Sequence, residues 1–144
     1  MSGLTIQAIK EALSDSLAAR IDRDVTVRPF RDPPATRPCI TMEIADITYY
    51  LTFGSAGLAK LDLTLTLRLG NSDSDSQDIA MSDYLSGGTG NTSSIFDAIN
   101  GNVDLGGLVD SCKCLEVLPP REDGDDYTAV FPVSILCKKV GAQA

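Results

Sequence analysis

Apolar and polar side chains alternate without a break from Leu61 to Leu69, which is the most regular pattern in the chain. A period of two is typical of a β-strand that has one face on a core and the other on water or a partner. The apolar face of this run carries five leucines. Burying each of them contributes about 1.5–3 kcal/mol before the chain entropy is subtracted, so we expect this strand to form the centre of the core. Its polar face carries Asp62, Thr64, Thr66 and Arg68.

The beginning of the chain has the spacing of an amphipathic helix. Between Thr5 and Ile21 apolar side chains recur every three or four residues, so they fall on one stripe of a helix. We expect this helix to lie on the leucine face of the sheet. The stripe consists of Ile6, Ile9, Leu13, Leu17 and Ile21.

Shorter alternating runs predict further strands in the first half of the chain. Residues 25–28 predict a short strand that stops at Pro29. The proline-rich segment 30–38 predicts an exposed loop, because proline cannot donate a ladder hydrogen bond. Residues 40–44 and 47–53 alternate separately and predict two strands. The second of these is expected to form a long hairpin with the leucine strand, and the hairpin end is predicted to project beyond the core toward another subunit.

The middle of the chain predicts two short helices separated by a glycine-rich break. Ser74 and Gln77 have the spacing of a capping box at the start of a helix over 75–85. A second helix is expected to run through Ile99, with its N-cap at residue 92 or 93. The glycines between them favour two separate helices over one continuous helix.

The last third of the chain returns to strands. One strand is predicted to run through Leu118 and to stop at Pro119 and Pro120, and an acidic turn over 121–126 leads into the final strand. Since Pro132 cannot donate a hydrogen bond to a neighbour, the final strand is predicted to lie at an edge or to carry a bulge. Its apolar face comprises Tyr127, Ala129, Phe131, Val133, Ile135 and Cys137.

The order of these segments determines the fold class that we expect. Helices and strands come in runs rather than in strict alternation, which favours an α+β fold. Its mainly antiparallel sheet of about five to six strands is expected to pack against an N-terminal helix and two short helices. With 144 residues and 43% hydrophobic side chains, the chain is expected to form a single domain over 1–144.

Charge and targeting signals narrow the possible partners. Twenty acidic and twelve basic residues give a net charge of −8, which argues against wrapping duplex DNA or binding an anionic membrane. Residues 1–13 lack the basic start and the continuous apolar run of a signal peptide. The apolar stretch 49–69 carries charges and has the strand period, so no membrane span is expected. Four cysteines in such a chain are expected to be reduced thiols of a protein made in the cytoplasm.

Candidate catalytic chemistry is sparse. The chain contains no histidine, which removes Ser-His and Cys-His nucleophile pairs and most catalytic metal sites. Cys112 and Cys114 fall on one face of a predicted strand, and no second pair stands at a zinc-site spacing. Buried thiols are therefore the favoured interpretation, with a metal site or a cross-strand disulfide as alternatives. The sequence predicts no enzyme, no metal and no cofactor.

In its order of segments the chain resembles the tail terminator proteins of long-tailed phages, especially those of actinobacterial phages. The resemblance covers nearly the whole chain and concerns its pattern, not a catalytic motif. It rests on the amphipathic first helix ending in Leu17–Ile21, the segment Val25–Pro29 with its proline-rich loop, the aromatic strand Tyr49–Phe53, the alternating strand ending at Leu69, Gln77–Leu85 with its glycine break, Ser93–Ile99, and Leu105–Val109 before the final hairpin.

The resemblance implies a structural virion protein of the tail and neck. Copies would form a homo-oligomeric ring of about six subunits. The ring would cap the tail tube protein, stop tube growth and join the tail to the head connector or stopper protein. An acidic lumen would repel phosphate, so DNA would pass through it without specific binding.

Two sets of residues are candidates for subunit or partner contacts. The arginines around the proline-rich loop are expected to meet an acidic neighbour, and the polar face of the leucine strand is expected to form the subunit seam. For each set the alternative is an ordinary solvated face. The sets are Arg28, Arg31 and Arg37, and Asp62, Thr64, Thr66 and Arg68.

Other functions remain compatible with the sequence. A head-completion or connector protein of the same neck would differ only in its partner. A small carboxylate-dependent enzyme or an acidic ligand-binding domain would instead show turnover or a bound small molecule at constant mass. A monomeric structural protein of unrelated origin is a third alternative.

Overall fold

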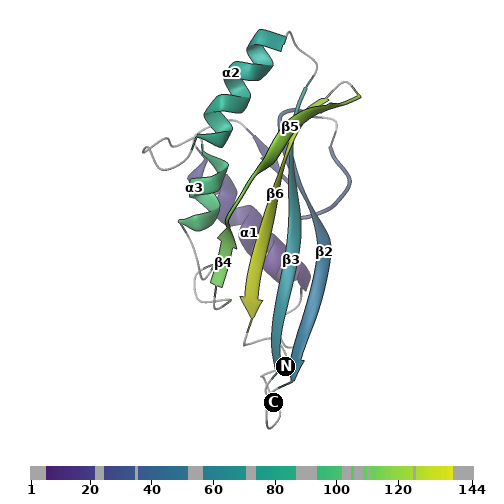
Figure 1. The fold of residues 1–144 in the computed structure, drawn as a ribbon, viewed down its shortest axis with the longest axis vertical. Coiled ribbons are helices and arrows are strands. Elements are labelled where there is room, and N and C mark those ends of the chain that lie inside the picture. The colour runs from purple at the N-terminus through teal and green to yellow at the C-terminus, as the bar shows by residue number, and fades with distance from the viewer. Residues whose placement is uncertain are drawn as a thin grey trace.

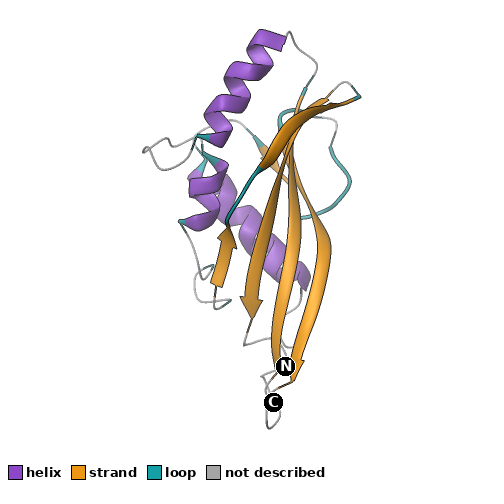
Figure 2. Cartoon of the chain, in the orientation of Figure 1, coloured by secondary structure: helices purple, strands orange, loops and turns teal. Residues whose placement is uncertain are grey.

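The computed structural model describes residues 6–21, 25–34, 36–51, 57–70, 74–86, 94–101, 105, 109, 111–124 and 126–137. This part of the chain forms an α+β fold, as predicted, with helices on one face of a curled, mainly antiparallel sheet (Figures 1 and 2). Its elements are α1 (Ile6–Arg20), β1 (Thr26–Val27), β2 (Cys39–Leu51), β3 (Gly57–Leu69), α2 (Ser74–Leu85), α3 (Ile95–Asn100), β4 (Ser111–Cys114), β5 (Leu118–Asp123) and β6 (Asp126–Cys137).

The sheet is built around the alternating strand β3. Its order is β1-β2-β3-β6-β4, and β5 also pairs with β6. β3 pairs with one edge of β6 along its length. β4 and β5 both pair with the other edge of β6, each with a different part of it. Only β1 and β2 are parallel among the described strand pairs.

The core confirms both amphipathic patterns. All five leucines of β3 from Leu61 to Leu69 are buried, and they share one cluster with the apolar stripe of α1. Leu65 lies opposite Met42 of β2 and Phe131 of β6, and all three side chains are fully buried. Burial of these facing side chains is the main term that holds α1 on the sheet.

The prediction of two strands over 40–44 and 47–53 is wrong, because β2 is continuous from Cys39 to Leu51. The ladder with β3 shifts register between Ile44 and Asp46, so Ala45 is an extra residue on β2. Such a bulge moves the side chains that follow to the opposite phase while the strand continues. The change of phase in the sequence was therefore a bulge and not the end of a strand. Residues 52 and 53 lie outside the described part.

Two proline predictions are also wrong. β5 continues through Pro119 and Pro120, where the ladder to β6 shifts register between Leu118 and Arg121, so neither proline has to donate to it. β6 is not an edge strand, since β3 pairs with one side of it and β4 and β5 with the other. On that second side the pairing stops at residue 130 and resumes at 133, and Pro132 lies in this gap.

The short helices begin and end near the predicted residues, with different caps. The side-chain amide nitrogen of Gln77 donates to the carbonyl of Gly70 at 2.9 Å, while the side chain of Ser74, the other half of the predicted capping box, lies outside the described part. α3 is capped by Ser94, whose Oγ accepts from the backbone N–H of Asp97 at 3.1 Å. The predicted caps at 92 and 93 lie outside the described residues.

The last residue of α3 fastens this helix to the sheet. The side-chain amide of Asn100 donates to the carbonyl of Cys114 and accepts from its N–H, both at 2.9 Å. It thus pairs with the edge of β4 as a neighbouring strand would.

The β2–β3 hairpin extends past the other strands, as predicted. Leu51 pairs with Gly57 beyond the point where Ala59 meets the last residue of β6. In Figure 1 this end of the sheet lies well beyond α1 and β4. Contact of this end with another subunit stays a prediction.

Candidate functional site

The three candidate arginines around the proline-rich loop do not form one surface. The guanidinium of Arg28 lies over the ring of Phe30, 5.3 Å from its centroid. Arg31 is exposed, whereas Arg37 is half-buried and points to the sheet. The structure therefore separates Arg31, which faces solvent, from the half-buried Arg28 on Phe30 and the half-buried Arg37 on the sheet.

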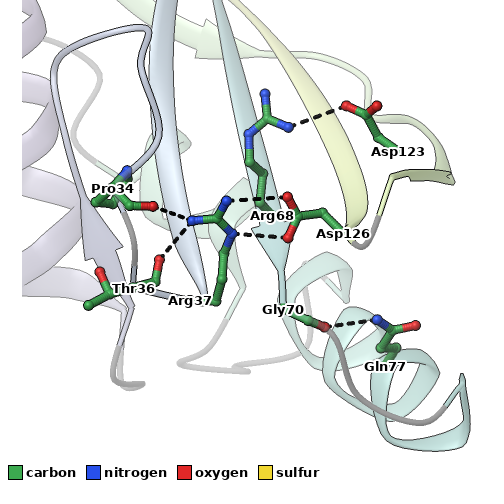
Figure 3. A network of polar contacts seen from close by, with 8 residues as sticks. All are labelled: Pro34, Thr36, Arg37, Arg68, Gly70, Gln77, Asp123 and Asp126. Carbon is green, nitrogen blue, oxygen red and sulfur yellow. Dashed lines mark hydrogen bonds and ion pairs between the residues drawn. The ribbon is translucent and has the colours of Figure 1, made fainter.

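Arg37 fastens the loop to the start of β6 (Figure 3). Its Nε and Nη2 donate to the two carboxylate oxygens of Asp126 at 3.0 and 3.3 Å. Its Nη1 donates to the carbonyls of Pro34 and Thr36. The hydrogen bonds to Asp126 raise the pKa of Arg37, and partial burial opposes this. Bidentate arginine–carboxylate pairs of this kind are strong and directional, so Arg37 has a structural role whether or not it also contacts a partner.

The upper part of the polar face of β3 is covered by the same network. Arg68 donates through Nη1 to Asp123 at 3.3 Å, and Thr66 beside it is half-buried. Arg68 Nε is buried without a partner among the described residues. Cys39 of β2 lies opposite Arg68 and is fully buried, which raises the pKa of its thiol, although Arg37 and Arg68 oppose that shift.

The lower part of the polar face of β3 is open. Asp62 and Thr64 line a hollow of about 320 Å³ together with residues of β2, β4 and β6. Leu115, which follows β4, lies at this hollow and is 82% exposed. Lys113 and Glu116 complete the charged groups of the lining. This outer hollow is thus an apolar depression with a few charges around it, on the face of the sheet opposite the core.

A second depression lies at the outer edge of β2. The backbone of segment 28–30 continues beside β2, since Arg28 donates to Ile40 and Met42 donates to Phe30. Beyond this point Phe30, Arg31 and Asp32, Lys10 of α1, and residues 42–44 of β2 enclose a cleft of about 440 Å³. We refer to it as the loop cleft.

The loop cleft has exposed apolar groups and unpaired charges. Phe30 and Ile44 are 46% and 43% exposed. Neither Lys10 nor Arg31 forms an ion pair with a described residue. Of the candidate contact residues, then, the structure brings Asp62 and Thr64 to the outer hollow and Arg31 to the loop cleft. Arg68 and Arg37 belong to the polar network of Figure 3, and Thr66 is half-buried beside Arg68.

Sequence reasoning missed the three most telling apolar side chains of these surfaces. Phe30 belongs to the loop that is predicted to be exposed, and Ile44, although predicted on an apolar strand face, is 43% exposed. Alternation from Cys112 and Cys114 puts Leu115 on the opposite face of β4, which was the available hint of its exposure. The break in phase after Ile44 was the hint that the surroundings of Ile44 change there.

Cys39, Cys112 and Cys114 are buried thiols outside any disulfide, as predicted. Cys114 Sγ donates to the carbonyl of Glu116 at 3.1 Å. Burial raises the pKa of Cys114 from 9.0 to about 11. Within the described ranges no three His, Cys, Asp or Glu side chains come together in a way that could hold a metal ion.

The raised pKa of Cys114 predicts a loss of stability in alkaline solution. The unfolded chain loses the thiol proton near pH 9 and the folded chain near pH 11, so the contribution is complete below pH 9 and is lost as the pH rises through 11. We expect the free energy of unfolding to fall by about 2 kcal/mol more over this interval than in Cys114→Ala. Urea unfolding at several pH values measures the difference, and parallel pH curves for the two proteins would contradict it.

Comparisons with known proteins leave the function to be argued from these surfaces. No protein-family model matches the chain, and no curated protein matches its sequence. No helix in the described part of the chain is both long and apolar enough to cross a membrane.

Proposed function

We propose that this protein is a tail terminator of a long-tailed phage, whose copies form a ring on the end of the tail tube. The observation that carries the proposal is the outer hollow, where Leu115 is 82% exposed beside the polar residues Asp62 and Thr64. An exposed large apolar side chain at a depression of mixed polarity is typical of a protein contact surface. The order of segments that resembles tail terminators gives this contact a specific partner.

The arrangement of the sheet supports assembly into a ring. Beyond Met42, β2 has no strand partner on its outer edge among the described residues, and the β2–β3 hairpin extends past the body of the sheet. In a ring each subunit uses two different surfaces, one for each neighbour. The outer hollow, the loop cleft and the hairpin provide several such surfaces on one small domain.

The charge of the chain fits a ring through which DNA passes. With a net charge of −8, a ring of identical subunits would repel phosphate and hold no DNA in its lumen. A head-completion protein of the same neck would share this property, so the partner distinguishes the two functions.

The decisive experiment mixes the purified protein with preformed tail tubes of the same phage. After sedimentation removes free protein, we expect negative-stain images with a cap at one tube end. Binding to DNA-filled heads instead would assign the protein to the connector. A stable monomer that binds neither tubes nor heads would overturn the proposal. The alternatives of an enzyme or a ligand-binding domain would then have to be tested.

Leu115 provides a variant that tests the outer hollow. We expect Leu115→Glu to fold with unchanged stability, because the side chain is exposed, and to bind tube ends or its own copies at least about tenfold more weakly. Sedimentation with and without tubes measures the binding. The control is Thr26→Glu, an exposed strand position at the opposite edge of the sheet, which should bind as the wild type does. Equal binding by the two variants would show that the outer hollow is solvated and not a contact.

A further inference from the structure

The first half of α2 has one side that is exposed among the described residues. Met81 and Tyr84 bury the second half of the helix, whereas Asp75, Asp78 and Ile79 are exposed, and Ile79 is 67% exposed. In Figure 1 this end of α2 extends away from the sheet. A short helix gains most of its stability from packing, and Ile79 leaves apolar surface on this side of α2 open to a partner.

The exposed side of this helix combines one apolar group with negative charge. Asp75, Asp78, Ile79 and Ser82 are spaced three or four residues apart or adjacent, so they lie on one stripe. The two carboxylates form no ion pair with a described residue. We call these four residues the α2 stripe.

Three depressions on the described surface are candidates to receive Ile79, and charge distinguishes them. The depression at residues 118–121 of β5 is lined by a single cation, Arg121, which offers only one partner for the two carboxylates of the α2 stripe. The outer hollow is lined by one cation, Lys113, and two anions, Asp62 and Glu116. That lining would repel the carboxylates of the α2 stripe.

The loop cleft offers more positive charge to the α2 stripe than the outer hollow does. Two cations, Lys10 and Arg31, and two anions, Asp32 and Glu43, line it, and the guanidinium of Arg28 stands over its Phe30. Phe30 and Ile44 supply the apolar surface for Ile79.

The two surfaces lie where a head-to-tail contact needs them. In Figure 1 α2 lies at the upper end of the molecule, beyond the sheet, and β2 runs along the right-hand side of the sheet, so the two surfaces belong to different parts of one copy. A stripe in one part and a cleft in another generate a heterologous contact that repeats from copy to copy and closes a ring when the rotation fits.

We propose that the α2 stripe of one copy docks into the loop cleft of the next copy, with Ile79 between Phe30 and Ile44 and with Asp75 and Asp78 facing Lys10 and Arg31. This inference rests on the proposed function, because it names the contact by which the subunits of the ring join. It also accounts for three of the five large apolar side chains that are exposed in the described part of the chain.

The test is a charge reversal on each surface, read by sedimentation velocity and native mass spectrometry with and without tail tubes. We expect Arg31→Glu and Asp78→Arg each to weaken self-association at least about tenfold. An equimolar mixture of the two variants should regain wild-type assembly. In the mixture each α2 stripe finds a cleft of complementary charge, either both native or both reversed, if the two variants alternate around the ring.

Matched controls separate this contact from an effect of net charge. Asp15→Arg on α1 and Arg121→Glu on β5 change exposed residues outside both surfaces and should assemble as the wild type does. If the wild type self-associates and neither the α2-stripe reversal nor the cleft reversal changes this association, the inference is overturned. The proposal that the copies form a ring is not affected by that result. Weaker binding of the cleft variant to tubes at unchanged self-association would also overturn it, since the occupant would then be the tube protein.

The proposed function is judged on the same samples by the caps at tube ends. A single reversed variant that no longer self-associates in solution but still forms caps on tube ends supports both the inference and the terminator function. If the wild type does not self-associate either with or without tubes, the inference is overturned. If the wild type self-associates but does not bind tubes, the proposed function is overturned.

Discussion

Leu65→Ala is expected to lower the free energy of unfolding by about 3 kcal/mol, which is among the largest effects of any single truncation in this chain. Leu65 is fully buried at the centre of β3, opposite Met42 and Phe131, which are also fully buried. Removing its side chain eliminates apolar burial and leaves a cavity that the neighbouring strands cannot close. Thermal unfolding followed by circular dichroism should show a melting temperature lower by about 10 °C.

The adjacent position provides the control for this prediction. Thr64 lies one residue away on the opposite face of β3 and is half-buried at the outer hollow. Thr64→Ala should change the free energy of unfolding by less than about 1 kcal/mol. Equal losses for the two variants would mean that the leucine face does not form the core.

Arg37→Glu is expected to cost about 2 to 3 kcal/mol of stability, although Arg37 belongs to a segment that also carries candidate contact residues. The change removes both hydrogen bonds to Asp126 and places two carboxylates at the same point. The side chains of Arg37 and Asp126 are only 25% and 18% exposed, so solvent screens this repulsion incompletely. Urea unfolding of the variant and the wild type measures the loss.

A second charge reversal tests whether the loss arises from this pair. Arg37→Glu combined with Asp126→Arg should recover part of the lost stability, because the attraction is restored with its direction reversed. Arg31→Glu serves as the control, since Arg31 is exposed and makes no ion pair with a described residue. Full stability of Arg37→Glu would contradict the structural role of this pair.

These two arginines have a consequence for assembly experiments. Reversing Arg31 and Arg37 together would mix a surface effect with a folding defect. Arg31 alone is therefore the appropriate probe of the loop cleft, and Arg37 belongs to stability measurements.

Periodicity in the sequence determined which side chains face the core. The leucine face of β3, the apolar stripe of α1 and the inward face of β6 were all predicted and are buried where described. A one-residue shift of such a pattern would move every apolar side chain to the solvent face, so the pattern alone specifies the orientation of each element. The α+β class followed from the order of these elements.

Features that depend on the neighbour of a strand were not accessible from the sequence. Pro119 and Pro120 predicted a strand end, and Pro132 predicted an edge strand or a bulge. Each lies inside a strand at a point where the ladder on one side is irregular or interrupted. A proline interrupts a strand only if the neighbour needs its N–H, and the position of the neighbour is a tertiary property.

For the two sets of candidate contact residues, too, the tertiary structure decided the surroundings of each side chain. The sequence by itself determined the polar face of β3, but only the tertiary structure decided that Arg68 is paired with Asp123 while Asp62 and Thr64 line the outer hollow. Likewise the sequence gives no reason to distinguish the arginines at 28, 31 and 37. In the structure Arg37 alone pairs with Asp126, which lies 89 residues further along the chain. Long-range pairing of this kind depends on how the chain folds back on itself, which local periodicity does not record.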